Sequence, residues 1–442
     1  MKLTKMLNNV IRTVGLNMFV SVLFLPVALY AQAEKTLTLD SLQQMARENY
    51  PYVRQLMLNS QQGQEAVKSV RSNWLPDLSV SGKTTLQSEY TFVSLPSAML
   101  EQYGINMGSG KKFQYQGSAS VNQLIYDGGI NRASGKLKQL ESEIEGNNIQ
   151  LSMLQVEDAV NALFENILVS HQQLKMLNFQ KTDLKGRKKN LQAAVENGIV
   201  LQSVLLELQS EILHLEQQKT EVKSALVRFY SHLSFFTQQQ IDTAIVMQQP
   251  ALIADCGEDF SARPDFRKFA KRVQVQDWQL KMLRRQSLPK LSFFANGYWG
   301  RPGLNMMKYD NHFWGITGIN LKWNLNHLYD FSHDKNKVEL QRSIIKNQQN
   351  IFEIEMSRQL ADINNEIFKN RQLLTRDDEV VKTRTEIKET AAVQLENGAI
   401  TFSDYLTKLT DESRAVANRN IHKIQLSMNF FKKRTLIGGG KH

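Results

Sequence analysis

Few residue groups in this 442-residue chain have the types and spacing of a catalytic site. The segment "GINMGSGKK" has the glycines and lysines of a phosphate-binding loop. However, the spacing from Gly104 to Gly110 is one residue too long, and Lys112 stands where the motif needs Ser or Thr. The sequence contains no nucleophile elbow, no HExxH motif and no paired catalytic carboxylates. We therefore expect neither an enzyme nor a cofactor.

A second group has side chains that could bind a metal. His327 and His333 lie close to Asp330 and Asp334, but a six-residue spacing on a helix puts the two imidazoles on different faces, so we expect no metal site. Cys256 is the only cysteine, so it cannot form an internal disulfide, and we interpret it as a partly buried structural thiol.

Composition indicates what kind of elements carry these residues. Gly and Pro number only 23 and 8, while Gln, Glu, Lys and Asn crowd long stretches, which favours extended helices. The formal charge is +11 but is spread along the chain without a Lys/Arg block, so we expect no nucleic-acid partner.

Residues 1–33 have the pattern of a secretory signal peptide. A basic start and the apolar run "GLNMFVSVLFLPVALY" end at Ala31-Gln32-Ala33, which predicts cleavage before Glu34. The alternative, a membrane anchor helix, is less favoured because the run is short and contains Pro26. No later apolar run reaches 18 residues, so we expect an exported protein without a transmembrane helix.

The rest of the chain is a two-fold repeat. "ENG" occurs at 196–198 and again at 396–398, and "VNQLIYD" (121–127) aligns with "LKWNLNH" (321–327) at the same offset. We expect a first repeat at 34–235, a linker at 236–262, a second repeat at 263–436 and a short tail at 437–442. A surplus of about 13 residues in the first copy falls in the long loop 87–112.

Each repeat contains two alternating strands, expected within 77–123 and 290–324. Apolar residues alternate from Leu78, from Phe113 to Val121, from Leu291 to Trp299 and from Phe313 to Trp323. Each strand has about ten residues or more, the length of a tilted transmembrane β-strand.

After each strand pair comes a long helical hairpin, expected at 130–235 and 330–436. Apolar residues in steps of three and four, such as Val160, Ile167, Leu177 and Leu184, predict a coiled-coil surface and no globular core. The glycines of the two ENG turns, Gly198 and Gly398, would end the helices at the hairpin tips.

Four strands cannot close a barrel, and an open sheet edge is not viable in lipid, so the chain must pool strands with copies of itself. Two copies would supply eight strands and three would supply twelve.

Several motifs, in this order and duplicated, resemble the TolC family of outer-membrane efflux and type I secretion ducts. They are "LTLDSLQQMARENYP", "SNWLPDLSVSG", "QLIYDGG" with Asp127, Gly128 and Gly129 at the strand-to-helix junction, and the tips "ENGIVLQSVLLELQ" and "ENGAITFSDYLTKL". The resemblance covers nearly all of the mature chain. It implies a mixed α and transmembrane β fold: a trimeric 12-stranded β-barrel, four strands per chain, continued by a 12-helix tunnel. It also implies a homotrimer in outer-membrane lipid of a Gram-negative bacterium, serving an inner-membrane transporter through a periplasmic adaptor.

The sequence departs from the family pattern at the second junction and at the tips. The second junction lacks the glycine pair. The acid that the family has six residues past the tip glycine is Asp404 in the second repeat but Val204 in the first, and a further acid is replaced by Thr407. A ring of Asp404 would favour cations at a pore constriction, whereas the alternative is an acid that suits a helix start. Val204, Leu395 and Ile400 would then close the constriction by apolar packing.

The hairpin tips are also the expected docking site for an adaptor. The candidates are Gly198, Ile199, Ser203, Gly398, Ala399 and Ser403, with plain turn geometry as the alternative. The main rival function is a periplasmic coiled-coil scaffold or adaptor without a pore, which would leave the four strands without a role.

Overall fold

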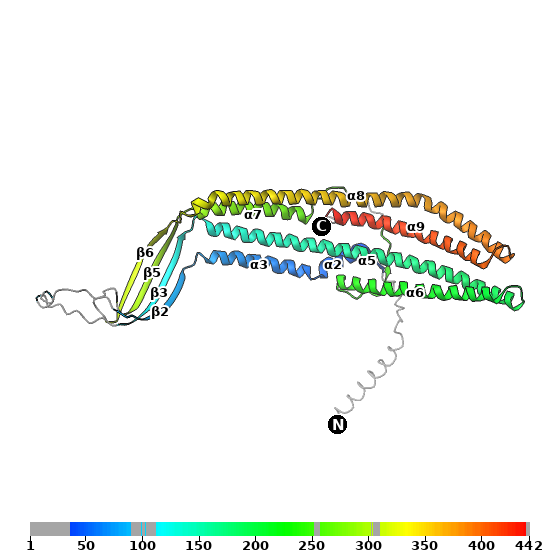
Figure 1. Ribbon diagram of the computed structural model, residues 1–442, viewed down its shortest axis with the longest axis horizontal. Coiled ribbons are helices and arrows are strands. Elements are labelled where there is room, and N and C mark those ends of the chain that lie inside the picture. Colours follow the sequence, from blue (N-terminus) through cyan, green and yellow to red (C-terminus); the bar gives the residue numbers. More distant parts are fainter. Residues whose placement is uncertain are drawn as a thin grey trace, which may run out of the picture.

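The structure is a computed structural model, and it describes residues 36–89, 112–251, 257–301 and 310–438, together with Met99, Gln102 and Gly303. Figure 1 shows an elongated rod of helices with a small sheet at one end. The expected signal peptide, most of the loop 87–112, Cys256 and the chain beyond residue 438 lie outside the described residues. No helix in the described segments is both long and apolar enough to cross a membrane.

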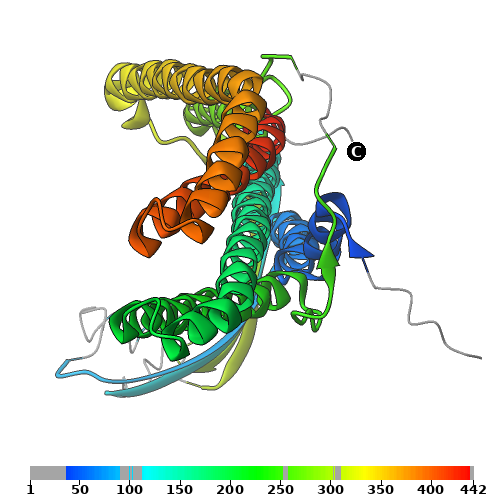
Figure 2. The same cartoon turned by 90° about the vertical axis from the view of Figure 1, so that its right-hand side faces the viewer.

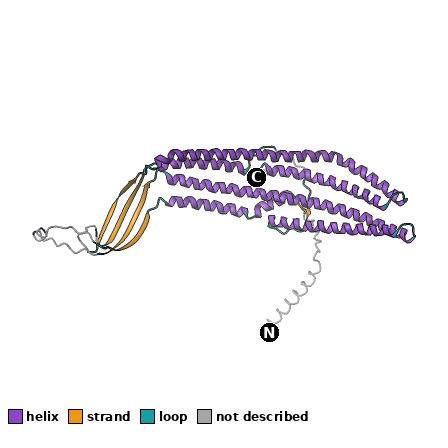
Figure 3. Cartoon of the chain, viewed as in Figure 1, coloured by secondary structure: helices purple, strands orange, loops and turns teal. Residues whose placement is uncertain are grey.

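The described elements follow the expected order of helices and strands (Figure 3). They are β1 (Thr36–Leu37), α2 (Leu39–Asn49), α3 (Tyr52–Ser72), β2 (Asp77–Leu86), β3 (Phe113–Tyr126), α5 (Ile130–Glu196), α6 (Gln202–Thr237), β4 (Val246–Met247), α7 (Pro264–Gln286), β5 (Lys290–Arg301), β6 (His312–Lys322), α8 (His327–Glu396) and α9 (Phe402–Leu436). Thr38 caps α2, because its hydroxyl oxygen accepts a hydrogen bond from the Ser41 amide.

Two helical hairpins, α5 with α6 and α8 with α9, end in the same kind of turn. Gly198 and Gly398 have φ angles of 70° and 69°, the left-handed region in which glycine is unstrained. The amides of Ile199 and Ala399 donate to the carbonyls of Ala194 and Gln394, at 2.9 and 2.8 Å. These six-to-one bonds define a Schellman motif at each tip, so both ENG turns end their helices as expected.

The helices lie side by side in four positions across the rod. α3 and α6 occupy one edge, α5 comes next, α7 and α9 share the third position end to end, and α8 forms the other edge (Figure 1). Seen from the tips, α5 lies between α6 and α8 (Figure 2). Among the described residues, α3 and α8 contact helices of the layer on one side only, so α3/α6 and α8 form its two edges.

The helical packing is a coiled-coil seam that widens into a core at mid-rod. Ile167, Leu177 and Leu184 of the expected seam are almost fully buried. The expectation that there is no globular core is wrong at mid-rod. There Phe164, Tyr230 and Phe431 pack with α2 in a compact cluster whose other members come from α5, α6, α9 and β4. Buried aromatic residues from three separated helices fill this space, which periodicity within one helix does not indicate.

Polar contacts attach α2 to this mid-rod cluster. Arg47 makes two hydrogen bonds, 2.5 and 2.9 Å, with the carboxylate of Glu157, which is only 3% exposed. The Gln43 amide donates to Asn161 Oδ1 at 2.6 Å, and the Asn161 amide donates in turn to Thr435 at 3.1 Å. The parallel pair β1–β4 lies beside them and was not expected. These contacts hold the N-terminal helix against both hairpins.

The strands form one antiparallel sheet in the order β2-β3-β5-β6. β3 pairs with β5, so the two repeats meet in the middle of the sheet, and β2 and β6 are left as its edges. The sheet therefore carries the same two open edges as the helical layer, because β2 follows α3 and β6 leads into α8.

Candidate functional site

One side of the four-stranded sheet is apolar. The register places on it, from all four strands, Leu78, Val80, Leu86, Phe113, Tyr115, Ala119, Val121, Leu291, Phe293, Ala295, Trp299, Phe313, Ile319 and Leu321. We call this the apolar face. Val80 is 87% and Phe313 83% exposed in the single chain. The same side also carries Gln123 and, at its outer end, Arg301. A large exposed surface that is mainly apolar marks an interaction site, and it agrees with the alternation expected from the sequence.

The other side of the sheet, the polar face, carries mainly hydroxyl and amide groups. Ser81 and Ser118 face each other across β2 and β3 with their Oγ atoms 2.8 Å apart. Gln114, Ser120 and Asn296 lie on the same side. The alternation along β2 and β3 thus separates an apolar side from a polar one.

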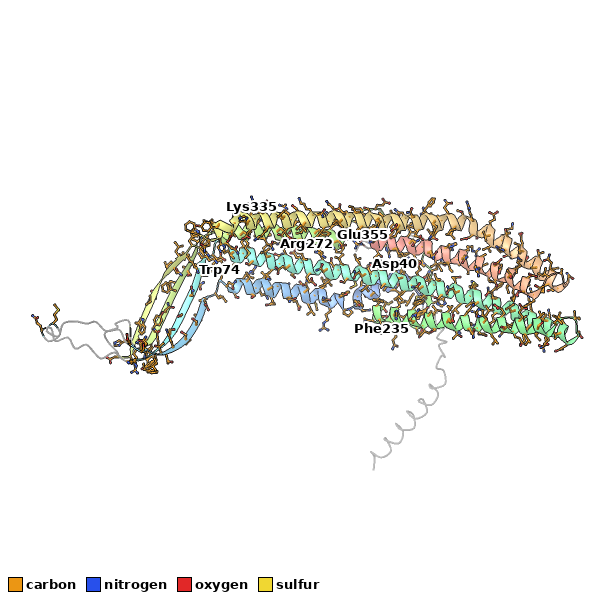
Figure 4. All side chains as sticks on the ribbon, in the orientation of Figure 1. Asp40, Trp74, Phe235, Arg272, Lys335 and Glu355 are labelled. Carbon is orange, nitrogen blue, oxygen red and sulfur yellow. The ribbon has the colours of Figure 1, made fainter. Side chains whose placement is uncertain are left out.

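Aromatic residues gather at both ends of the apolar face. At the outer end, Tyr115 lies 5.7 Å from the Trp299 ring, beside Phe313. At the helical end, Trp323 donates a hydrogen bond to the Ser287 carbonyl at 3.0 Å, and Trp74 lies between α3 and β2 (Figure 4). Trp323 directly follows the end of β6 and is ten residues beyond Phe313, a length that spans about 25 Å for an extended chain tilted by about 40°. This is the height of the apolar band of an outer-membrane barrel, where aromatic residues form girdles at both interfaces.

The expected junction residues Asp127, Gly128 and Gly129 come together at the start of α5. The Asp127 carboxylate accepts hydrogen bonds from the amides of Gly129 and Asn131, at 2.7 and 2.6 Å, and so caps the helix. Arg285 at the end of α7 donates to the Gly129 carbonyl at 2.7 Å. The junction therefore links the sheet, the first hairpin and the helix that opens the second repeat.

The second junction has no glycine pair because its backbone takes a different path. Gly128 and Gly129 have φ angles of 71° and 84°, whereas Asn326, which precedes α8, has φ −60°. An ordinary side chain is unstrained at that angle, so the sequence difference has a direct conformational reason.

His327, Asp330, His333 and Asp334 are exposed or half-buried side chains in the first two turns of α8. Within the described parts of the chain, no three His, Cys, Asp or Glu residues gather closely enough to hold a metal ion.

The structure places Asp404 in a capping box at the start of α9. Its carboxylate accepts from the Thr401 amide at 3.1 Å and from the Thr401 hydroxyl at 2.6 Å, while the Asp404 amide donates to Thr401 Oγ1 at 3.1 Å. The Thr401 hydroxyl and amide lower the pKa of Asp404. This geometry accounts for the acid as a helix start, and Asp404 remains exposed to solvent.

The other constriction candidates divide into two groups. Val204, Leu395 and Ile400 pack on an apolar cluster near the tips, the tip cluster, whose members are Leu177, Leu184, Leu208, Leu215, Ala391, Phe402, Tyr405 and Leu409. Thr407 lies on the surface, where its hydroxyl donates to the Ser403 carbonyl at 3.1 Å. Apolar packing at the tips is therefore present within one chain.

The expected docking residues lie together at the far end of the rod. Gly198, Ile199, Ser203, Gly398, Ala399 and Ser403 are all exposed there. Ile199 in particular is 76% exposed, although it is apolar. Gly198 and Gly398 form the turns themselves, since both have left-handed backbone angles.

A contact between the two hairpins was not found by sequence reasoning. The buried Tyr405 donates from its hydroxyl to Asp183 Oδ2 at 2.7 Å, and Arg187 bonds the same oxygen at 3.0 Å. The Arg187 guanidinium also lies 4.0 Å from the centre of the Tyr405 ring. Burial and the neighbouring Asp183 carboxylate raise the pKa of Tyr405, so the phenol stays protonated as a donor. We call these three residues the hairpin clamp.

The sequence matches no family model, and no curated protein matches it either. Solved structures do match over 91% of the chain. The CmeC outer membrane channel of Campylobacter jejuni has a TM-score of 0.70 at 15% identity, with 86% of its own chain covered. The outer membrane protein VceC of Vibrio cholerae has 0.68 at 14%, with 97% covered. The MtrE outer membrane channel of Neisseria gonorrhoeae, in its open state, has 0.67 at 12%, with 89% covered.

The chain therefore has the fold of the outer-membrane channels, with a helical rod and a small antiparallel sheet. The resemblance to the TolC family implied a chain with these helical and strand regions, and that part of the expectation is confirmed.

Proposed function

We propose that the chain is one subunit of a homotrimeric export channel of the TolC family in the outer membrane of a Gram-negative bacterium. The apolar face of the sheet carries this proposal. A surface that exposes Leu78, Val80, Phe313 and Ile319 to water would be unfavourable, and it becomes favourable when lipid covers it. The polar face then lines a water-filled passage.

Closure into a ring is supported by the position of the open edges. β2 and β6 are the sheet edges, and α3/α6 and α8 are the corresponding edges of the helical layer. A contact between opposite edges of neighbouring copies is heterologous, and it builds a closed ring when each copy is rotated by the same whole fraction of a turn. Both edges meet the neighbour at once, so one symmetry operation closes the sheet and the rod together.

The helical edges carry exposed apolar stripes at intervals of seven residues, as a coiled-coil contact requires. On α6 the stripe contains Leu206, Leu213 and Val227, and on α8 it contains Leu373, Val380 and Ile387. Phe235 also projects from α6, away from its neighbours (Figure 4). Packing α6 of one copy against α8 of the next would bury both stripes.

Three copies supply twelve strands and twelve helix positions, enough for a barrel that encloses water. The rod then extends the passage into the periplasm as a passive duct. Its tips, with the exposed Ile199 and Ala399, dock a periplasmic adaptor that joins the channel to an inner-membrane transporter. Asp404 in three copies would line the passage near that end.

A pair of variants on one strand tests the proposal. Lysine at Val80, near the middle of the apolar face, would cost about 2–4 kcal/mol on the lipid side of a barrel. Ser79→Lys places the same charge one residue away on the polar face, where it meets water. We expect Val80→Lys to reduce the amount of oligomer in the outer-membrane fraction and Ser79→Lys to leave it unchanged.

The two alternatives give different results in the same experiment. Recovery of the wild-type protein from the soluble periplasmic fraction, with no difference between the two variants, would instead support a periplasmic scaffold without a pore.

A further inference from the structure

The polar face contains an apolar group that the alternation of the strands does not require. Phe294, Tyr298, Trp314 and Ile316 lie together on β5 and β6, among serine and asparagine side chains. We call these four residues the aromatic ledge. The rings of Tyr298 and Trp314 are stacked, with centroids 5.1 Å apart and planes inclined by 18°. Ile316 is 41% exposed.

The ledge is shaped by a glycine. A Cβ atom at Gly318 would lie 2.9 Å from the Phe294 ring, so only glycine lets this ring lie across β6. The sequence thus keeps a flat apolar surface on the side of the sheet that faces water. Stabilisation of the sheet explains two of these features, because the Phe294 ring covers Gly318 and the Tyr298 and Trp314 rings pair across the strands. It does not explain why Ile316 and the outer surfaces of the rings stay exposed on this face.

The same face is positively charged. The register of the strands places Lys83, Lys290 and Lys322 on this face, together with one acidic residue, Asp77. Within the described segments, no ion pair joins these lysines to a carboxylate. Lys290 lies directly opposite Lys322 in the register. Like charges placed opposite each other destabilise a sheet, so an anion between them is favourable.

Closure of the proposed ring brings a lysine to the ledge. β6 of one copy meets β2 of the next, and both strands reach the helical end of the sheet, at Lys322 and Asp77 respectively. Lys83 is six residues from Asp77, and Ile316 is six residues from Lys322. Lys83 and Ile316 therefore lie at the same distance from the helical end of the sheet, on adjoining edges. The ledge of one copy and Lys83 of the next then form one surface.

We propose that the aromatic ledge, with Lys83 of the adjoining copy, is a binding site in the barrel wall for planar aromatic anions that pass through the channel. Ring faces attract other ring systems by stacking, and the lysine selects negative charge. This inference rests on the proposed function, which makes the polar face the wall of the passage.

Current recordings from the full-length oligomer in a planar bilayer test the site. Both blockers are added on the side of the bilayer where the strands of the channel end. Naphthalenesulfonate should block the current at a concentration about two- to tenfold lower than hexanesulfonate, which has the same charge and no ring. A naphthalene carrying trimethylammonium should block less than the sulfonate. Trp314→Leu should remove most of the difference between the two sulfonates, and Lys83→Gln should remove the difference between anion and cation.

The matched control is Trp299→Leu, which removes a tryptophan at nearly the same height from the apolar face. It should leave the preference for naphthalenesulfonate unchanged. Equal block of the wild-type channel by both sulfonates would overturn the inference without any variant. A preference that Trp314→Leu and Trp299→Leu reduce equally would also overturn it. An oligomer without conductance would overturn the proposed function, and this inference with it.

Discussion

Replacing Gly128 by alanine tests whether the first strand-to-helix junction depends on close packing or only on backbone conformation. Gly128 and Gly198 have nearly the same φ, 71° and 70°, so alanine meets the same left-handed strain at both, about 1–2 kcal/mol. Their surroundings differ. A Cβ at Gly128 would lie 2.8 Å from the Arg285 carbonyl oxygen and 3.0 Å from Leu288 Cβ, whereas a Cβ at Gly198 meets nothing within 4 Å.

The close contacts should add about 1–3 kcal/mol at Gly128, as other overpacked sites do. We therefore expect Gly128→Ala to destabilise its surroundings by about 2–5 kcal/mol and Gly198→Ala by about 1–2 kcal/mol. Backbone hydrogen exchange of the oligomer in detergent measures this locally. Both substitutions should speed amide exchange near the changed residue. The increase in the first turn of α5 in Gly128→Ala should exceed the increase at the hairpin tip in Gly198→Ala by about fivefold to 150-fold. Equal factors at the two sites would refute the packing argument.

Three further changes separate the roles of other residues. Tyr405→Phe removes the hydroxyl bond of the hairpin clamp to the partly exposed Asp183 and should weaken the contact between hairpins by about 1–2 kcal/mol. Faster exchange at the start of α9, absent in Tyr329→Phe, would show it, and unchanged exchange would contradict it. Gly63→Ala puts a Cβ against the Ser142 side chain, 2.5 Å from its Cβ, and should lower the thermal unfolding midpoint, whereas Gly186→Ala has open space and should raise it slightly. The reverse order would exclude close α3–α5 packing as the reason for Gly63. Asp404→Ala should reduce the cation preference of leak currents if three copies form a ring, and Val204→Ala should increase the leak. Unchanged selectivity in Asp404→Ala would leave this residue with its helix-capping role alone.

The sequence predicted the elements well because their signals are local. A period of two marked the strands, and steps of three and four marked the seam through Ile167, Leu177 and Leu184, all of which are buried. The ENG turns were assigned correctly for the same reason: a glycine after a helix has one common conformation.

Contacts between distant segments could not be predicted in this way. Tyr405 and Asp183 are 222 positions apart, and nothing near either residue indicates the other. The mid-rod cluster likewise depends on how α2 lies against both hairpins, which the period of a single helix does not encode. At Asp404 the sequence left two roles open, and the capping box establishes one of them, because that role needs only the neighbouring Thr401.

The central claim is that several copies of this chain enclose a water-filled passage through a membrane. The most direct test measures, on one detergent-purified preparation, the native mass and the conductance after insertion into a planar bilayer. We predict the mass of three chains and discrete current steps. A water-soluble single chain that adds no current would contradict the account.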